Sequence, residues 1–148
     1  MVDDVRIGSE RVALAFPQTY MNDSGQAVRL LVKHNDVTET DRLIVVHDEL
    51  DLPPGRVRVK VGGGLAGHNG LRSIRDHLHA DGFLRVRIGI GKPPGGKHRG
   101  AEHVLKKPIK GEREELAVSV EEAADAVEMI LADGVERAMN RYNTSPSG

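Results

Sequence analysis

Two short segments in which apolar residues alternate with cations constrain the fold more than any other feature. They are residues 55–61 (GRVRVKV) and 84–90 (LRVRIGI). Side chains alternate between the two faces of a β-strand, so each segment predicts a strand with one apolar face and one basic face. The cations of these two strands are Arg56, Arg58, Lys60, Arg85 and Arg87. We expect the apolar faces to meet the core and the basic faces to contact water.

Apolar spacing predicts further strands and helices around these two segments. Residues 11–16 and 42–47 are short apolar runs rich in β-branched residues, a pattern typical of strands that are buried on both faces. Apolar residues also recur at helical spacing. The helices that this spacing predicts cover residues 24–35, 68–78, 111–132 and 134–142.

Strands that alternate with helices favour an α/β fold, here a three-layer α/β/α sandwich. The strands at 42–47 and 55–61 are joined by too few residues for the helical crossover that parallel neighbours need. We therefore expect a mixed, mostly parallel sheet. The length of 148 residues indicates one domain, which we place at residues 1–143, followed by a disordered tail at 144–148.

Composition excludes several classes of protein. Lysine and arginine number 21 and aspartate and glutamate 22, a net charge of −1, so any surface that binds an anion must be local. The chain has no cysteine, which excludes disulfides, thiolate zinc sites and cysteine nucleophiles. The N-terminus is acidic and no window approaches the length of a membrane span, so we expect a soluble, cytoplasmic protein with no membrane partner.

Four polar clusters stand out as candidate sites. Three of them begin where a predicted strand ends, and open α/β sheets place their ligand crevices at the carboxyl ends of strands. The four clusters cover residues 17–25, 47–55, 62–71 and 85–91. The pattern predicts a site that is built from loops at one edge of one sheet.

Each cluster also has a plainer structural interpretation. The glycine run 62–64 is either a seat for a phosphate or a flexible turn. His68 is either a site residue or a helix cap. The acids Asp48, Glu49 and Asp51 are either a divalent-metal or carboxylate-pair site or residues that point in different directions, and we favour no metal.

The basic strand positions are likewise either a solvated sheet face or a local track for phosphates. Aromatic residues are scarce, with two Phe, two Tyr and no Trp. This scarcity argues against recognition by stacking many bases. A nucleic-acid partner would then be held mainly through its backbone or its terminus.

The clusters, taken in order, resemble the bacterial peptidyl-tRNA hydrolase family, whose enzymes cleave the ester between a peptide and the 3′ end of tRNA. The resemblance spans about residues 7–143. It is carried by PQTYMNDSG at 17–25, HDELDLPPG at 47–55, GGGLAGHNGLRSI at 62–74, RVRIGIGKP at 85–93 and AMNRYN at 138–143. It implies a monomeric hydrolase that acts in translation on peptidyl-tRNA and uses no metal and no cofactor.

The resemblance also assigns roles to residues of this chain. Asn22 and Asn69 match the asparagines that bind the peptidyl and 3′-terminal part of the substrate, and Tyr20 matches an aromatic residue beside the tRNA end. Asp48 matches the carboxylate that orients the catalytic histidine. On these matches Asp48, Asn22 and Asn69 are the catalytic group.

A basic pair completes the site that the resemblance implies. Lys60 and Arg87 match the two cations that grip the 5′-phosphate of the acceptor stem. Both residues occupy positions already assigned to a basic strand face. A clamp made of two residues does not need a high net charge.

The chain departs from the family pattern in one important respect. Family members begin with a strand that ends in a GLGNPG-like loop, followed by a TRHN-like segment that supplies the general-base histidine. The 148 residues contain neither segment, and His47 and His68 do not match that base. Leu65 and Ala66 also stand where the family has glycine or histidine. We expect a chain that lacks the family's N-terminal segment and that turns over weakly or not at all.

Several explanations of this departure stay open. Either the chain is a fragment or the product of a late start site, or its sheet is completed by another segment or subunit. The alternative function is that of a non-hydrolytic tRNA-binding or RNA-binding relative that has lost the histidine. A glycine-rich α/β domain that binds some other anion is a third interpretation.

Overall fold

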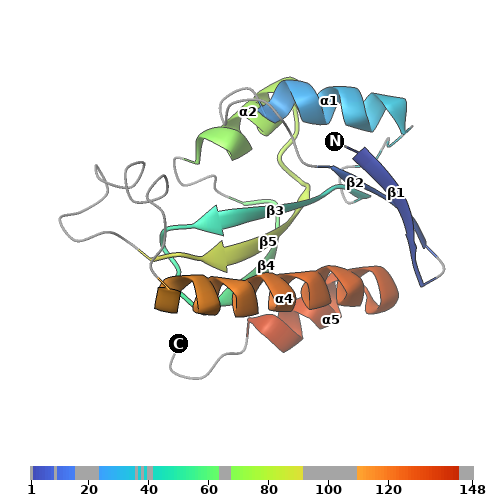
Figure 1. Cartoon of the computed structure of the whole chain (residues 1–148). Coiled ribbons are helices and arrows are strands. Elements are labelled where there is room, and N and C mark those ends of the chain that lie inside the picture. The colour runs from blue at the N-terminus through green and yellow to red at the C-terminus, as the bar shows by residue number, and fades with distance from the viewer. Residues whose placement is uncertain are drawn as a thin grey trace. The chain divides into compact units, whose positions relative to one another are not determined.

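The computed structural model describes residues 2–8, 10–15, 24–35, 37, 39, 42–63, 68–91 and 110–143. This part of the chain forms four helices and five strands, and Figure 1 shows their course. The strands are β1 (Val2–Ile7), β2 (Glu10–Ala15), β3 (Ile44–Glu49), β4 (Val57–Val61) and β5 (Leu84–Gly89). The helices are α1 (Ser24–His34), α2 (Asn69–Leu78), α4 (Lys110–Asp133) and α5 (Val135–Tyr142). The expected α/β class is therefore confirmed.

Three of the strands form one sheet in the order β3-β5-β4. Between β3 and β5, Leu84 N–H donates to Leu43 C=O at 2.9 Å and Ile90 N–H donates to Glu49 C=O at 3.1 Å. The two strands therefore advance together and are parallel, and their arrows point the same way in Figure 1.

The pairing of β4 with β5 runs the other way. Gly89 N–H donates to Arg56 C=O at 2.8 Å, whereas Gly62 N–H donates to Phe83 C=O at 3.0 Å. β4 therefore begins beside the end of β5 and ends beside its start, which makes the two strands antiparallel. The short connection between β3 and β4 leaves no room for a crossover helix, as the sequence predicted.

The remaining strands, β1 and β2, form an antiparallel two-stranded ribbon. The expectation of a mixed sheet is confirmed, but β3 and β5 are the one parallel pair among the described strands. A parallel majority is thus wrong for this part of the chain. The expectation that 11–16 is buried on both faces is also wrong, because every residue of β2 retains partial or full exposure. A ribbon of two strands has no second layer to bury both of its faces.

The described chain divides into two compact units. The first comprises Met1–Val45 and Val61–Leu84, and the second comprises Val46–Lys60 and Arg85–Gly148. In the first unit, α1 and α2 pack together. The apolar cluster of this unit contains Val28, Leu71, Ile74 and Phe83, with Val32, Leu43, Val45 and Leu78 packed against it.

The crossing of α1 and α2 depends on a glycine. Gly25 N–H donates to Ser73 Oγ at 2.9 Å, so a side chain of α2 satisfies one of the free N–H groups at the start of α1. A Cβ atom at Gly25 would overlap the backbone carbonyl of Ser73. Glycine is therefore required for this close approach.

In the second unit, α4 and α5 pack together. Small side chains, among them Ala123, Ala126 and Ala138, are buried on these helices. Gly134 has a φ of +94° and separates the two helices, in agreement with the predicted break. No side chain caps the start of α5.

Candidate functional site

The predicted site residues fall on different parts of the structure. Tyr20 and Asn22 lie outside the described residues. Asn69 is the first residue of α2. Asp48, Lys60 and Arg87 lie on β3, β4 and β5.

The hydrogen-bond register of the three-stranded sheet gathers polar residues on one of its faces. Side chains of paired residues on neighbouring strands point to the same side. Arg58 of β4 lies directly opposite Arg87 of β5, and Lys60 lies opposite Arg85. We call the face that these side chains share the polar face, and its residues are His47, Glu49, Arg56, Arg58, Lys60, Arg85 and Arg87.

We expected the cations of β5 to contact water, but Arg85 is only 1% exposed. β5 is the middle strand of the sheet. Arg85 Nε donates to His47 Nε2 at 3.2 Å, and Arg85 Nη2 lies 3.9 Å from Glu49 Oε1. Burial and the nearby charge of Arg87 lower the pKa of Arg85, and Glu49 raises it. The expectation of a solvated face is wrong at this position because other side chains, rather than water, surround the charge.

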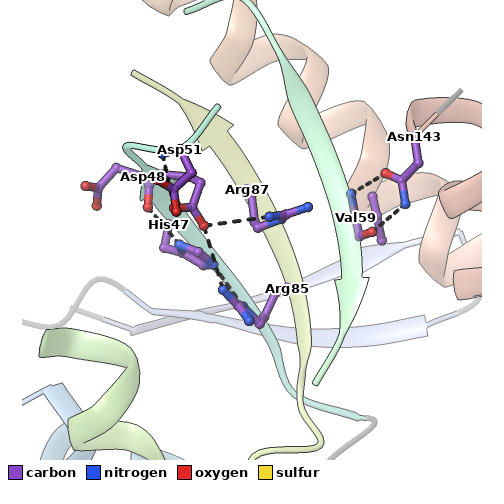
Figure 2. A network of polar contacts seen from close by, with 8 residues as sticks. His47, Asp48, Asp51, Val59, Arg85, Arg87 and Asn143 are labelled. Atoms are coloured by element: carbon purple, nitrogen blue, oxygen red, sulfur yellow. Dashed lines mark hydrogen bonds and ion pairs between the residues drawn. The ribbon is translucent and has the colours of Figure 1, made fainter. Parts of the chain in front are cut away.

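Glu49 joins the two arginines of β5. Its Oε1 atom, which pairs with Arg85, also lies 3.7 Å from Arg87 Nη1. Its Oε2 atom accepts from Asp51 N–H at 3.4 Å. Figure 2 shows Arg85 and Arg87 on the same strand, with dashed lines for the two ion pairs that they form with Glu49. The β5 arginines and Glu49 thus form a partly neutralised cluster inside the polar face.

Two of the three acids at the end of β3, Asp48 and Glu49, lie on opposite faces of the strand. Glu49 belongs to the polar face, while alternation along β3 directs Asp48 to the opposite face. The side chains of Asp48 and Glu49 therefore do not share a face of the strand. Within the described ranges, no group of three or more His, Cys, Asp or Glu side chains is arranged to hold a metal ion.

His47 has a structural role that sequence reasoning missed. Its Nδ1 atom lies 2.8 Å from the Asp48 carbonyl oxygen, and the residue is buried. The signal that was present is the spacing of His47 and Glu49, two residues apart on β3. The contacts of these two residues with the arginines of β5 depend on the register between the strands, which cannot be read from the sequence.

The glycine run behaves as a turn where the structure describes it. Gly62 and Gly63 have φ values of +58° and +91°, in the region that glycine adopts without strain. Because β4 is antiparallel to β5, this run leaves the sheet at the edge where β5 begins. The expectation that the loops gather at one edge is therefore wrong for the start of this loop. Residues 64–67, with Leu65 and Ala66, lie outside the described residues.

His68 caps α2, one of the two interpretations left open for it. The N–H of Leu71 donates to His68 Nδ1 at 3.2 Å. A cap of this kind satisfies one of the N–H groups that a helix start leaves without an intrahelical partner.

The C-terminal end of α5 is attached to β4. The Asn143 amide donates to Val59 C=O at 2.7 Å, and Asn143 Oδ1 accepts from Val59 N–H at 2.9 Å. Arg58 Nη1 donates to Tyr142 C=O at 3.0 Å. Figure 2 shows Asn143 facing Val59 across the edge of the sheet. Burial and the charges of Arg56 and Arg87 lower the pKa of Arg58, which reflects crowding of cations here.

None of the described helices is long and apolar enough to cross a membrane.

The sequence profile of the family described as Peptidyl-tRNA hydrolase matches residues 1–147. The chain belongs to the peptidyl-tRNA hydrolase family. Among the similar relatives, the peptidyl-tRNA hydrolase of Nocardia farcinica is 52% identical over 138 residues, which cover 93% of this chain and 70% of the relative. That of Frankia casuarinae is 51% identical over 142 residues, which cover 96% of this chain and 71% of the relative.

Solved structures of the same family share the fold. A crystal structure of a peptidyl-tRNA hydrolase in complex with N-propanol has a TM-score of 0.87 and 39% identity, over 98% of this chain and 72% of that chain. The peptidyl-tRNA hydrolase of Acinetobacter baumannii has a TM-score of 0.86 and 40% identity, over 95% of this chain and 70% of that one. The resemblance expected from the motifs is confirmed.

Proposed function

We propose that this chain hydrolyses the ester bond of peptidyl-tRNA and so returns tRNA from stalled translation. The observation that carries the proposal is the family match over residues 1–147. In this function Asp48 orients the general base that activates water, and Asn22 and Asn69 hold the substrate around the ester. Tyr20 lies beside the tRNA end. No cofactor and no metal take part.

The proposed phosphate clamp is supported by the register of the sheet. Lys60 of β4 and Arg87 of β5 lie on neighbouring strands. They share a face of the sheet and occupy diagonal positions, because Lys60 lies directly opposite Arg85. Side chains at diagonal positions of an antiparallel pair are close enough for long residues to reach a common ligand. A phosphate between them would meet one ammonium and one guanidinium group.

We expect the 148 residues by themselves to hydrolyse slowly. They contain no TRHN-like segment, and the loss of a general base commonly lowers a rate by factors of about 10²–10⁴. The second candidate is a relative that binds tRNA without hydrolysing it. Both candidates keep the clamp formed by Lys60 and Arg87.

The proposal extends to the architecture and setting of the enzyme. Leu84, Arg85 and Val86 are consecutive and all buried, so β5 is covered on both faces, which supports a three-layer sandwich. We assign both compact units to one domain at residues 1–143, since the boundary between the units falls inside β3. We expect a monomer that works in the cytoplasm, where its substrate is formed.

The decisive experiment measures the release of peptide from an N-blocked aminoacyl-tRNA in a single turnover with excess protein. We expect slow hydrolysis by the 148 residues and a rate about 10² or more higher when the leading segment of a relative is fused to them. A fused protein that binds tRNA and leaves the ester intact would favour the second candidate. Absence of tRNA binding at low salt would contradict both.

A further inference from the structure

We propose that His47, Arg85 and Glu49 form a positioning network that fixes the backbone at Asp48 and links it to Arg87. The inference rests on the proposed function, in which Asp48 serves the general base and Arg87 binds phosphate. None of the three network residues touches the reacting atoms in this proposal. They act through the residues that do.

The hydrogen bonds determine where the protons of His47 lie. Arginine has only donors, so His47 Nε2, 3.2 Å from Arg85 Nε, accepts and carries no proton. The ring is therefore neutral and its proton is on Nδ1. That N–H donates to the Asp48 carbonyl oxygen at 2.8 Å. A fully buried guanidinium thus sets the histidine tautomer, and the tautomer holds the peptide group that follows Asp48.

Glu49 holds the chain on the other side of Asp48. Its carboxylate lies 3.9 Å from Arg85 Nη2 and accepts from Asp51 N–H at 3.4 Å. Both sequence neighbours of Asp48 are thus buried in the polar face and tied to Arg85. Alternation turns the Asp48 side chain to the opposite face. Its direction therefore depends on a backbone that the network fixes.

Arg87 is linked to the same network through one oxygen atom. Glu49 Oε1 lies 3.7 Å from Arg87 Nη1 and 3.9 Å from Arg85 Nη2. If Arg87 exchanges its ion pair with Glu49 for one with a phosphate, Glu49 keeps its ion pair with Arg85. The second arginine therefore allows Arg87 to change partner without leaving a buried carboxylate unpaired.

The first test reads the tautomer of His47 from the ring-nitrogen resonances of the ¹⁵N-labelled 148-residue chain. We expect a protonated Nδ1 and an unprotonated Nε2 in the wild type. Arg85→Met should remove this pattern, while Arg75→Met, which removes an exposed arginine of α2 paired with Asp76, should preserve it. A wild-type ring that is protonated on Nε2, or a pattern unchanged by Arg85→Met, overturns the inference.

The second test is a double-mutant cycle in single-turnover hydrolysis by the fused protein, which carries the leading segment of a relative and with it the general base, with protein in excess. His47→Ala should lower the saturating rate about tenfold to a hundredfold, because misplacing a catalytic group by about 1 Å costs rates of this size. The protein concentration at half-saturation should not change. His47→Asn, which keeps a short N–H donor, should recover part of the rate, and this variant also serves if the alanine variant does not fold.

The cycle separates positioning from general stability. In an Asp48→Asn background, His47→Ala should change the rate by less than about twofold, because the residue through which it acts is already disabled. If His47→Ala lowered the rate by the same factor in the wild-type and Asp48→Asn backgrounds, the inference would be overturned. If the wild type neither binds tRNA nor hydrolyses the ester, the proposed function fails and the catalytic meaning of the network fails with it. The resonance test then still reports whether the network itself exists.

Discussion

At the scale of single residues, Arg85 shows that position in a sheet decides whether a charged side chain is buried or contacts water. Arg85 and Arg56 both lie in alternating segments of cations and apolar residues, yet Arg85 is buried while Arg56 is half-exposed. Removing a charge from water is costly unless a partner compensates it. Glu49 and His47 supply that compensation on the neighbouring strand.

We predict that Glu49→Ala lowers the free energy of unfolding by about 3–5 kcal/mol, since it leaves the buried Arg85 without its carboxylate. Asp76→Ala, which breaks an exposed pair with Arg75, should cost less than about 1 kcal/mol. Urea unfolding followed by circular dichroism measures both. Equal effects of the two substitutions would show that Arg85 does not depend on Glu49.

A second residue-scale prediction concerns alkaline pH. Burial and the charges of Asp125 and Glu122 raise the pKa of Tyr142 above 10.0, while Arg141 lowers it. The folded protein holds the phenolic proton more tightly than the unfolded chain does, so its stability falls as the pH rises above 10.

Tyr142→Phe removes this contribution. We expect the loss of stability between about pH 9 and 11 to be smaller in the variant than in the wild type. Urea midpoints measured across this range provide the test. Parallel pH profiles for the two proteins would contradict the assignment.

At the scale of elements, β4 depends on a residue that is distant in sequence. β4 is an edge strand of the described sheet, and such edges expose backbone groups that can pair with other chains. Asn143 occupies the Val59 backbone with one donor and one acceptor, as a neighbouring strand would. The end of α5 therefore closes part of this edge.

Asn143→Ala should lower the free energy of unfolding by about 1–3 kcal/mol, because both polar groups of the Val59 backbone lose their partner. Asn140→Ala is the matched control, since Asn140 is an exposed asparagine of α5, three residues before Asn143. It should change stability by less than about 0.5 kcal/mol. Thermal and urea unfolding measure the difference, and similar losses in both variants would contradict the role of Asn143.

The crossing of α1 and α2 makes a further prediction at this scale. Gly25→Ala places a methyl group against the Ser73 carbonyl and should cost about 1–3 kcal/mol through overpacking. Gln26→Ala, at the exposed next position, should be nearly neutral. An unchanged urea midpoint for Gly25→Ala would mean that the helices can separate without cost.

At the scale of the whole molecule, a net charge of −1 coexists with a concentration of cations on one face of a sheet. Five cations and one carboxylate share the polar face of the sheet. Phosphate binding depends on such local concentrations and is weakened by salt, because it releases condensed counterions. The near-neutral total is therefore compatible with the proposed RNA substrate.

Lys60→Ala and Arg87→Ala should each weaken tRNA binding and lower the slope of log affinity against log salt by about 1. Lys33→Ala, an exposed cation of α1, should leave the slope unchanged. Fluorescence titrations of tRNA at several salt concentrations measure the slopes. Slopes that match the wild type in both clamp variants would contradict a phosphate contact at these residues.

The local sequence was enough to locate most of the elements. Helical spacing placed α1, α2, α4 and α5 to within about two residues of their ends, because the pattern of a helix is complete within a few turns. The strand β1 was missed. Its acidic segment has little strand character of its own, and it becomes a strand by pairing with β2, where Val5 lies opposite Val12.

The sequence by itself therefore determined the α/β class, the alternating faces of β4 and β5 and the motifs of the family, all of which reside in short stretches of chain. Only the tertiary structure decided that β4 runs against β5, that Arg85 is buried and that His47 supports Asp48. These features arise from contacts between distant residues, such as His47 with Arg85, 38 positions apart. Burial and strand direction depend on what packs nearby, and no local pattern encodes that.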